Sequence, residues 1–219
     1  MAQTRAAGYD SAARWMHSAW VTAKGEKMSK SLGNGLSVPA VLAENSAWVV
    51  RYALGSVQYR SMLEWSDQTL PEAQSAYDRV SNFIERAGAA VGGQPPREEI
   101  VSISADALPA DFVAAMNDDI NVSGASAAIF TAIRSGNTLL SKLADRVDSD
   151  VAKDEVRAVL VNVRAMLDTL GLDPLAEPWV SEGAAGGAGS GADSAEHTAL
   201  DRLVSEQLEE RAEARKAKD

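Results

Sequence analysis

The chain has 219 residues, a net charge of −10 at pH 7 and no cysteine. Without cysteine, disulfides and thiolate metal sites are excluded, so the fold must be stabilised by packing. No apolar run approaches the roughly 18 residues of a membrane span. The acidic balance argues against a general nucleic-acid-binding protein, whose affinity comes from many Lys and Arg side chains. We expect a cytoplasmic protein with no membrane partner and no metal ligands in this chain.

The charge is unevenly distributed along the chain. Residues 1–80 carry eight Lys and Arg against seven Asp and Glu, whereas residues 81–219 carry 13 against 24. Any chemistry that involves phosphate groups is therefore expected in the first third of the chain.

The first third begins with a predicted strand. Residues Trp15–Thr22 are rich in bulky and β-favouring side chains, and they run into a loop that continues to Ser37. Pro39 suits the first turn of a short helix, Pro39–Glu44, and Ser46 can cap a second helix. In that second helix, Val49, Val50, Ala53 and Leu54 are expected to share one face.

The middle of the chain has helical periodicity. Apolar residues recur at helical spacing from Leu70 to Val91, and the same period returns in Phe112–Met116, Ala125–Leu143 and Val151–Leu170. An all-helical bundle is predicted. The acidic run at residues 117–119 is interpreted as a helix start whose carboxylates satisfy free amides, rather than as a metal site.

The last part of the chain has a different composition. Residues 183–195 consist of Gly, Ala, Ser and a single Asp, which predicts a flexible linker. Beyond it, Leu200, Leu203, Val204 and Leu208 lie in helical register in a highly charged tail.

One segment, residues 25–34, places two lysines three positions apart, with hydroxyl side chains between and after them and glycines on both flanks. Its central residues are Lys27, Met28, Ser29, Lys30 and Ser31. Glycines let a backbone approach a ligand closely, hydroxyls donate hydrogen bonds, and ammonium groups neutralise charge that develops on a departing phosphate. The pattern predicts a loop that binds a nucleoside triphosphate.

These five residues are similar to the KMSKS loop of class I aminoacyl-tRNA synthetases. The flanking segments resemble, in order and spacing, the carboxy-terminal part of actinobacterial cysteinyl-tRNA synthetases. They are residues 15–17, 50–52, 59–61, 112–121 and 170–175.

The resemblance implies a mainly α fold, in which a helical bundle follows a strand and loop remnant of a Rossmann-type catalytic domain. The predicted segments are the end of that domain (1–37), a helical stem-contact segment (38–66), the bundle (67–180), the linker (181–197) and the start of an anticodon-binding domain (198–219).

The resemblance also implies an activity for the full-length enzyme, a monomer that activates cysteine with ATP and Mg²⁺ and transfers it to tRNA(Cys). Lys27 and Lys30 would be catalytic, and Met28, Ser29 and Ser31 would join them in binding ATP.

Two arginines are candidate tRNA contacts. Arg51 and Arg60 would touch the tRNA, although each is as well suited to pairing with a carboxylate inside the helical segment.

Family members hold zinc with two Cys, a His and a Glu, and carry a His-x-Gly-His type signature, neither of which occurs here. A polypeptide of these residues alone is therefore expected to be inactive. Two alternatives remain open: a ligase that joins cysteine to an amino-sugar in mycothiol synthesis, and a non-catalytic helical module that binds tRNA or protein.

Overall fold

The structure is a computed structural model that describes residues 5–8, 12, 14–23, 25–28, 37–145 and 150–180. Residues 1–179 form one compact unit, and a second unit begins at Val180. The predictions for the linker (181–197) and the charged tail (198–219) lie outside the described residues. Among the residues described, no helix is long and apolar enough to cross a membrane.

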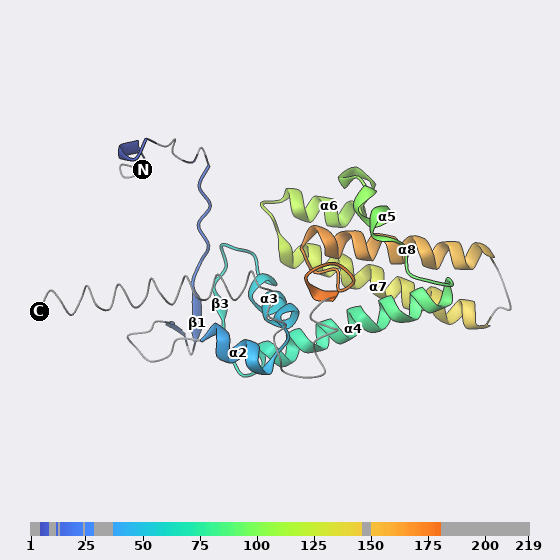
Figure 1. Ribbon diagram of the computed structural model, residues 1–219, viewed down its shortest axis with the longest axis horizontal. Coiled ribbons are helices and arrows are strands. Elements are labelled where there is room, and N and C mark those ends of the chain that lie inside the picture. Colours follow the sequence, from blue (N-terminus) through green and yellow to red (C-terminus); the bar gives the residue numbers. More distant parts are fainter. Residues whose placement is uncertain are drawn as a thin grey trace, which may run out of the picture. The chain divides into compact units, whose positions relative to one another are not determined.

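A small sheet precedes and joins the helices. Strand β1 (Val21–Ala23) pairs antiparallel with β2 (Glu26–Lys27) and parallel with β3 (Leu63–Glu64), in the order β2-β1-β3 (Figure 1). The predicted strand at Trp15–Thr22 is confirmed only at its end. β2 lies inside the predicted loop, and β3 lies inside the segment expected to be helical, so those two assignments are corrected. Strands of two residues are too short for an alternating pattern to reveal.

Two short helices follow the loop, as predicted. They are α2 (Val38–Glu44) and α3 (Ala47–Gly55), and the Ser46 hydroxyl accepts a hydrogen bond from the Val49 amide at 3.3 Å. The expected apolar face is only partly right. Val49 and Ala53 are buried with Trp48, but Leu54 is 43% exposed.

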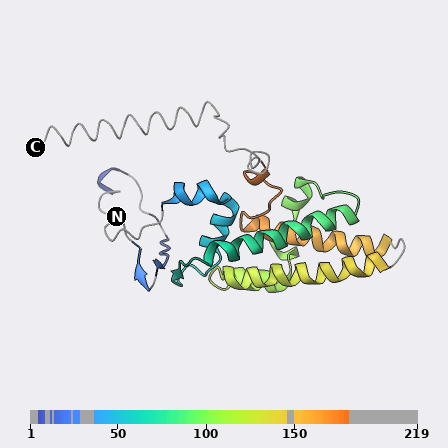
Figure 2. The same cartoon turned by 90° about the horizontal axis from the view of Figure 1, so that it is seen from below.

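The bundle confirms the predicted mainly α fold. Long helices α4 (Thr69–Ala90), α7 (Val122–Asp145) and α8 (Asp150–Thr169) lie side by side (Figures 1 and 2). The shorter α6 (Ala110–Asn117) packs on α7, and the connector from α4 holds α5 (Arg97–Ser102) and a 3₁₀ turn at Ala105–Ala107. The core consists of side chains from all three long helices, among them Val80, Phe83, Ile129, Ile133, Leu160 and Met166.

The acidic run at residues 117–119 does not begin a helix, which corrects its interpretation. α6 ends at Asn117, and Asp118 is its C-cap residue. The next helix is capped instead by Asn121, whose side-chain oxygen accepts a hydrogen bond from the Gly124 amide at 2.9 Å. Asn and Asp side chains favour both N-caps and turns, and the sequence alone does not distinguish these two positions.

A buried ion pair fixes the end of α8. Arg164 is 2% exposed and Asp173 is fully buried, and two guanidinium nitrogens donate to the carboxylate at 3.3 and 3.0 Å. The remaining Arg164 nitrogen donates to the Pro95 carbonyl at 2.6 Å. Arg97 approaches the same carboxylate at 3.6 Å from the surface. The pair therefore connects α8, the segment after it and the connector that follows α4.

Removing one partner of this pair should be costly, because the other is left charged in the core. We expect Arg164→Met to lower the free energy of unfolding by about 3–5 kcal/mol. Arg164→Met combined with Asp173→Leu should recover at least half of that loss. Urea denaturation followed by circular dichroism measures both variants. A single variant within about 1 kcal/mol of the unmodified chain would show that the pair contributes little.

Candidate active-site loop and its supports

The base of the lysine loop is held in the small sheet. Thr22 pairs with Lys27, and the Met28 amide donates to the Val21 carbonyl at 3.3 Å. Between the strands, Gly25 has φ of +76°, a conformation that glycine adopts without steric cost. The backbone of Lys27 is thus fixed at the start of the loop. Ser29, Lys30 and Ser31 lie outside the described residues.

Glu64 on β3 supports the turn between β1 and β2. One carboxylate oxygen accepts a hydrogen bond from the Gly25 amide at 3.1 Å, and the other accepts from the Thr22 hydroxyl. A carboxylate that receives both donors fixes the turn from which the loop leaves the sheet. Glu64 was not predicted from the sequence. No local signal could have found it, because its partners are about 40 residues away in the chain.

Arg60, a candidate tRNA contact, is engaged in an exposed cluster. Its Nε lies 2.8 Å from the Asp119 carboxylate and 2.8 Å from the Tyr59 hydroxyl, which itself donates to Asp119 at 2.8 Å. The hydrogen bond with Tyr59 and the charge of Asp119 raise the pKa of Arg60. Arg60 is therefore paired with a carboxylate, although Asp119 lies between α6 and α7 and not inside the helical segment (38–66). A contact between Arg60 and tRNA stays a prediction.

The turn between α6 and α7 is in an unusual conformation where it meets this cluster. Asp119 and Ile120 have φ of 52° and 56°, in the left-handed region that side chains with a Cβ avoid. Further contacts hold the turn: Gln58 donates to the Asp119 carbonyl at 3.4 Å, and the Ser123 hydroxyl donates to the Ser56 carbonyl at 3.1 Å. The turn thus joins the bundle to the segment that leads into β3.

Arg51, the other candidate tRNA contact, has a different partner. Its guanidinium donates to the Leu170 carbonyl at 3.1 Å. It also lines a cavity of about 640 Å³ whose other lining residues are largely apolar, including Leu42, Leu54 and Trp179. Arg51 and Arg60 therefore make contacts with separate segments, the turn that follows α8 and the α6–α7 turn, and these contacts do not join them in one cluster.

The zinc ion that the family resemblance implies does not fit the described residues. The chain contains no cysteine, and no three His, Asp or Glu side chains in the described ranges gather where they could hold a metal ion.

Comparison with known proteins defines the class. Residues 1–75 match the catalytic domain of class I (C) tRNA synthetases, and residues 111–174 match the DALR domain. The small sheet at the base of the lysine loop lies within the first match, and helices α7 and α8 lie within the second. The part of the chain that carries the lysine loop is thus similar to the catalytic domain of class I tRNA synthetases.

Within that class, the chain is similar over its whole length to cysteine–tRNA ligases. It is 81% identical over all 219 residues to the cysteine–tRNA ligase of Bifidobacterium longum (strain NCC 2705) and covers 40% of that protein. It is 48% identical to the enzyme of Beutenbergia cavernae and 41% identical to that of Streptomyces avermitilis, and it covers 42% of each. The chain spans about two fifths of the length of the curated relatives it matches.

The left-handed conformation at Asp119 allows a matched pair of substitutions. Asp119→Ala and Asp119→Gly both remove the contacts with Arg60 and Tyr59, but only glycine is free of steric cost at this φ. We expect the glycine variant to be about 1 kcal/mol more stable than the alanine variant, measured by urea denaturation. An alanine variant as stable as the glycine variant would show that the turn relaxes once the contacts are lost.

Proposed function

We propose that this chain is part of an enzyme that joins cysteine to tRNA(Cys). The observation that carries the proposal is the 81% identity over all 219 residues to a cysteine–tRNA ligase. In the first step the cysteine carboxylate attacks the α-phosphate of ATP, which releases pyrophosphate and leaves cysteinyl-adenylate. In the second, a terminal ribose hydroxyl of the tRNA takes the cysteinyl group and AMP leaves.

The lysine loop serves the first step in this proposal. Lys27 and Lys30 stabilise the charge that develops on the β- and γ-phosphates, and Met28, Ser29 and Ser31 complete the contact with ATP, which would bind together with Mg²⁺. The described geometry supports the role of Lys27, because the β1–β2 pairing and Glu64 fix the backbone where the loop leaves the sheet. A fixed base reduces the entropy that the loop loses when it closes on ATP.

Arg51 and Arg60 are assigned a tRNA contact only as a secondary part of the proposal. Both are exposed, but each already has a partner, the Leu170 carbonyl and Asp119 respectively. The same proposal includes the predicted segment boundaries at residues 37, 66, 180 and 197. It also includes a monomeric state and a cytoplasmic location. The names of the relatives favour tRNA over an amino-sugar as the acceptor of cysteine.

Substitution of Lys30 tests the proposed function. In the full-length enzyme we expect Lys30→Ala to lower cysteine-dependent exchange of pyrophosphate into ATP by about a hundred- to a thousandfold, because one donor that stabilises developing charge is lost. Lys142→Ala, in the last turn of α7, removes a lysine from the bundle and serves as the control. Normal exchange by the Lys30→Ala enzyme would refute the role given to the loop.

The same assay applied to a polypeptide of only these 219 residues should give no cysteine-specific exchange. Lysines accelerate the step only when nucleophile and α-phosphate are already held in line, and the described residues contain no metal-binding group through which cysteine would be held. Exchange by the purified polypeptide, with contamination by the host enzyme excluded, would show that the active site has been misplaced.

A further inference from the structure

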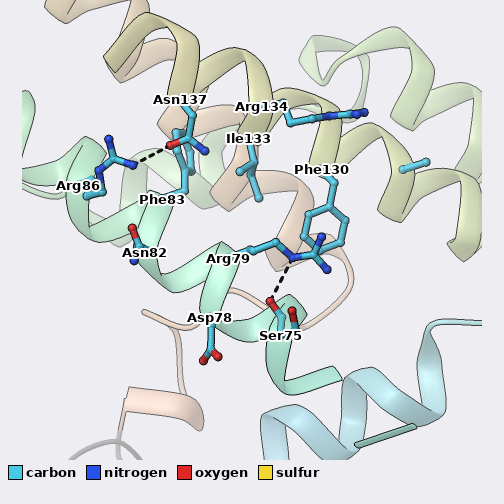
Figure 3. A pocket seen from close by; sticks show the side chains of 11 residues that line it. Ser75, Asp78, Arg79, Asn82, Phe83, Arg86, Phe130, Ile133, Arg134 and Asn137 are labelled. Atoms are coloured by element: carbon cyan, nitrogen blue, oxygen red, sulfur yellow. Dashed lines mark hydrogen bonds between the residues drawn. The ribbon is translucent and has the colours of Figure 1, made fainter. Parts of the chain in front are cut away.

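A groove runs along the seam between α4 and α7. It encloses about 630 Å³, and its walls include Phe83 and Ile133, which are buried in the core (Figure 3). Three arginines also line it: Arg79 and Arg86 on α4, and Arg134 on α7. Three guanidinium groups around one groove are unexpected in a part of the chain where acidic residues outnumber basic ones.

These three arginines differ from the others in the bundle. Of the six arginines that the structure describes between residues 67 and 180, the other three are each within 4 Å of a carboxylate; they are Arg97, Arg157 and Arg164. The groove arginines instead donate to neutral acceptors. The acceptors are the Ser75 carbonyl for Arg79 (3.1 Å), the Asn137 amide oxygen for Arg86 (3.2 Å) and the Thr131 hydroxyl for Arg134 (3.0 Å). Their positive charge is therefore oriented but not neutralised by the described residues.

The arrangement suits an extended anion better than a compact one. Arg79 and Arg86 are seven residues apart on α4, which is about 10 Å along the helix axis. Figure 3 shows Arg86 and Arg134 directed toward different ends of the groove rather than toward one point. The one carboxylate that lines it, Asp78, points away from the three guanidinium groups and accepts a hydrogen bond from Gln74. A single phosphate could not contact all three arginines.

The groove also has a flat surface and continues toward the sheet. The Arg79 guanidinium lies over the Phe130 ring at 4.8 Å, a cation–π contact. Ser75 and Arg79 also line a second cavity of about 470 Å³, which reaches Leu63 and Glu64 on β3. β3 is the strand that supports the turn at the base of the lysine loop. A polyanion in the groove would thus lie along a surface that leads to that strand.

We propose that the α4–α7 groove binds the sugar–phosphate backbone of RNA, with Arg79, Arg86 and Arg134 each contacting a phosphate. RNA carries its charges at regular, separated positions, and planar guanidinium groups donate paired hydrogen bonds to phosphate oxygens. The inference rests on the proposed function, in which the RNA is the tRNA that accepts cysteine. It adds the place on the bundle where the tRNA backbone is held.

The test compares two double variants of the full-length enzyme that lose the same charge. Arg86→Gln with Arg134→Gln removes two groove arginines, and Arg97→Gln with Arg157→Gln removes two arginines that have carboxylate partners. We expect the groove variant to raise the Kd and the KM for tRNA by roughly ten- to a hundredfold. The slope of log affinity against log salt should fall by about one for each lost phosphate contact. In the control variant, the Kd and the KM for tRNA should stay within about twofold of those of the unmodified enzyme, and the salt slope should not fall.

Thermal unfolding of both variants accompanies the binding measurements, so that a loss of fold is recognised. A salt slope in a folded groove variant equal to that of the control would overturn the proposal. So would a groove variant that keeps its affinity for tRNA but loses affinity for polyglutamate, because the groove would then be a site for acidic peptides. If the unmodified enzyme gives no cysteine-dependent exchange, the proposed function fails, whatever the groove binds.

Discussion

Three consecutive backbone carbonyls at the end of α8, those of residues 170–172, each accept a hydrogen bond from a side chain. The donors, in order, are Arg51, Trp179 and Trp48, at 3.1, 3.2 and 2.8 Å. A helix end normally leaves carbonyls without partners, and burial makes such groups costly. The local conformation needs glycine at 171, where φ is +66° and a Cβ would lie 2.7 Å from the Arg51 guanidinium. This turn attaches α3 to the bundle.

The position of the lysine loop depends on that attachment through the chain itself. α3 follows the loop, and the segment after α3 leads into β3, whose Glu64 holds the turn at the loop's base. Trp48 on α3 is 2% exposed and packs against Tyr52 and Tyr77, so its hydrogen bond lies inside the core. Asp173 follows in the same turn and is fixed by Arg164. The bundle is thus linked to the segments that flank the sheet at two places, through Trp48 on α3 and through the pair of Asp119 and Arg60.

The features that could be predicted from the sequence are those whose interacting residues lie close together in the chain. The long helices were predicted because their apolar period is local, and Ser46 was predicted to cap α3 because capping involves neighbours three residues apart. The five-residue motif indicated the chemistry of the loop but not its geometry. Glu64 was missed because its partners, one on β1 and one in the turn after it, are about 40 residues away in the chain. The groove arginines were missed because only the packing of α4 against α7 brings Arg134 close to Arg79 and Arg86.

Substitution of Trp48 by Phe tests most directly whether the end of α8 holds α3. The variant keeps an aromatic ring but loses the donor to the Leu172 carbonyl, a loss of about 1–3 kcal/mol for a buried group. The account predicts that amide hydrogen exchange in residues 48–55 becomes at least about tenfold faster, while exchange in the middle of α7 changes much less. Unchanged exchange in α3, or the same acceleration in every helix, would contradict it.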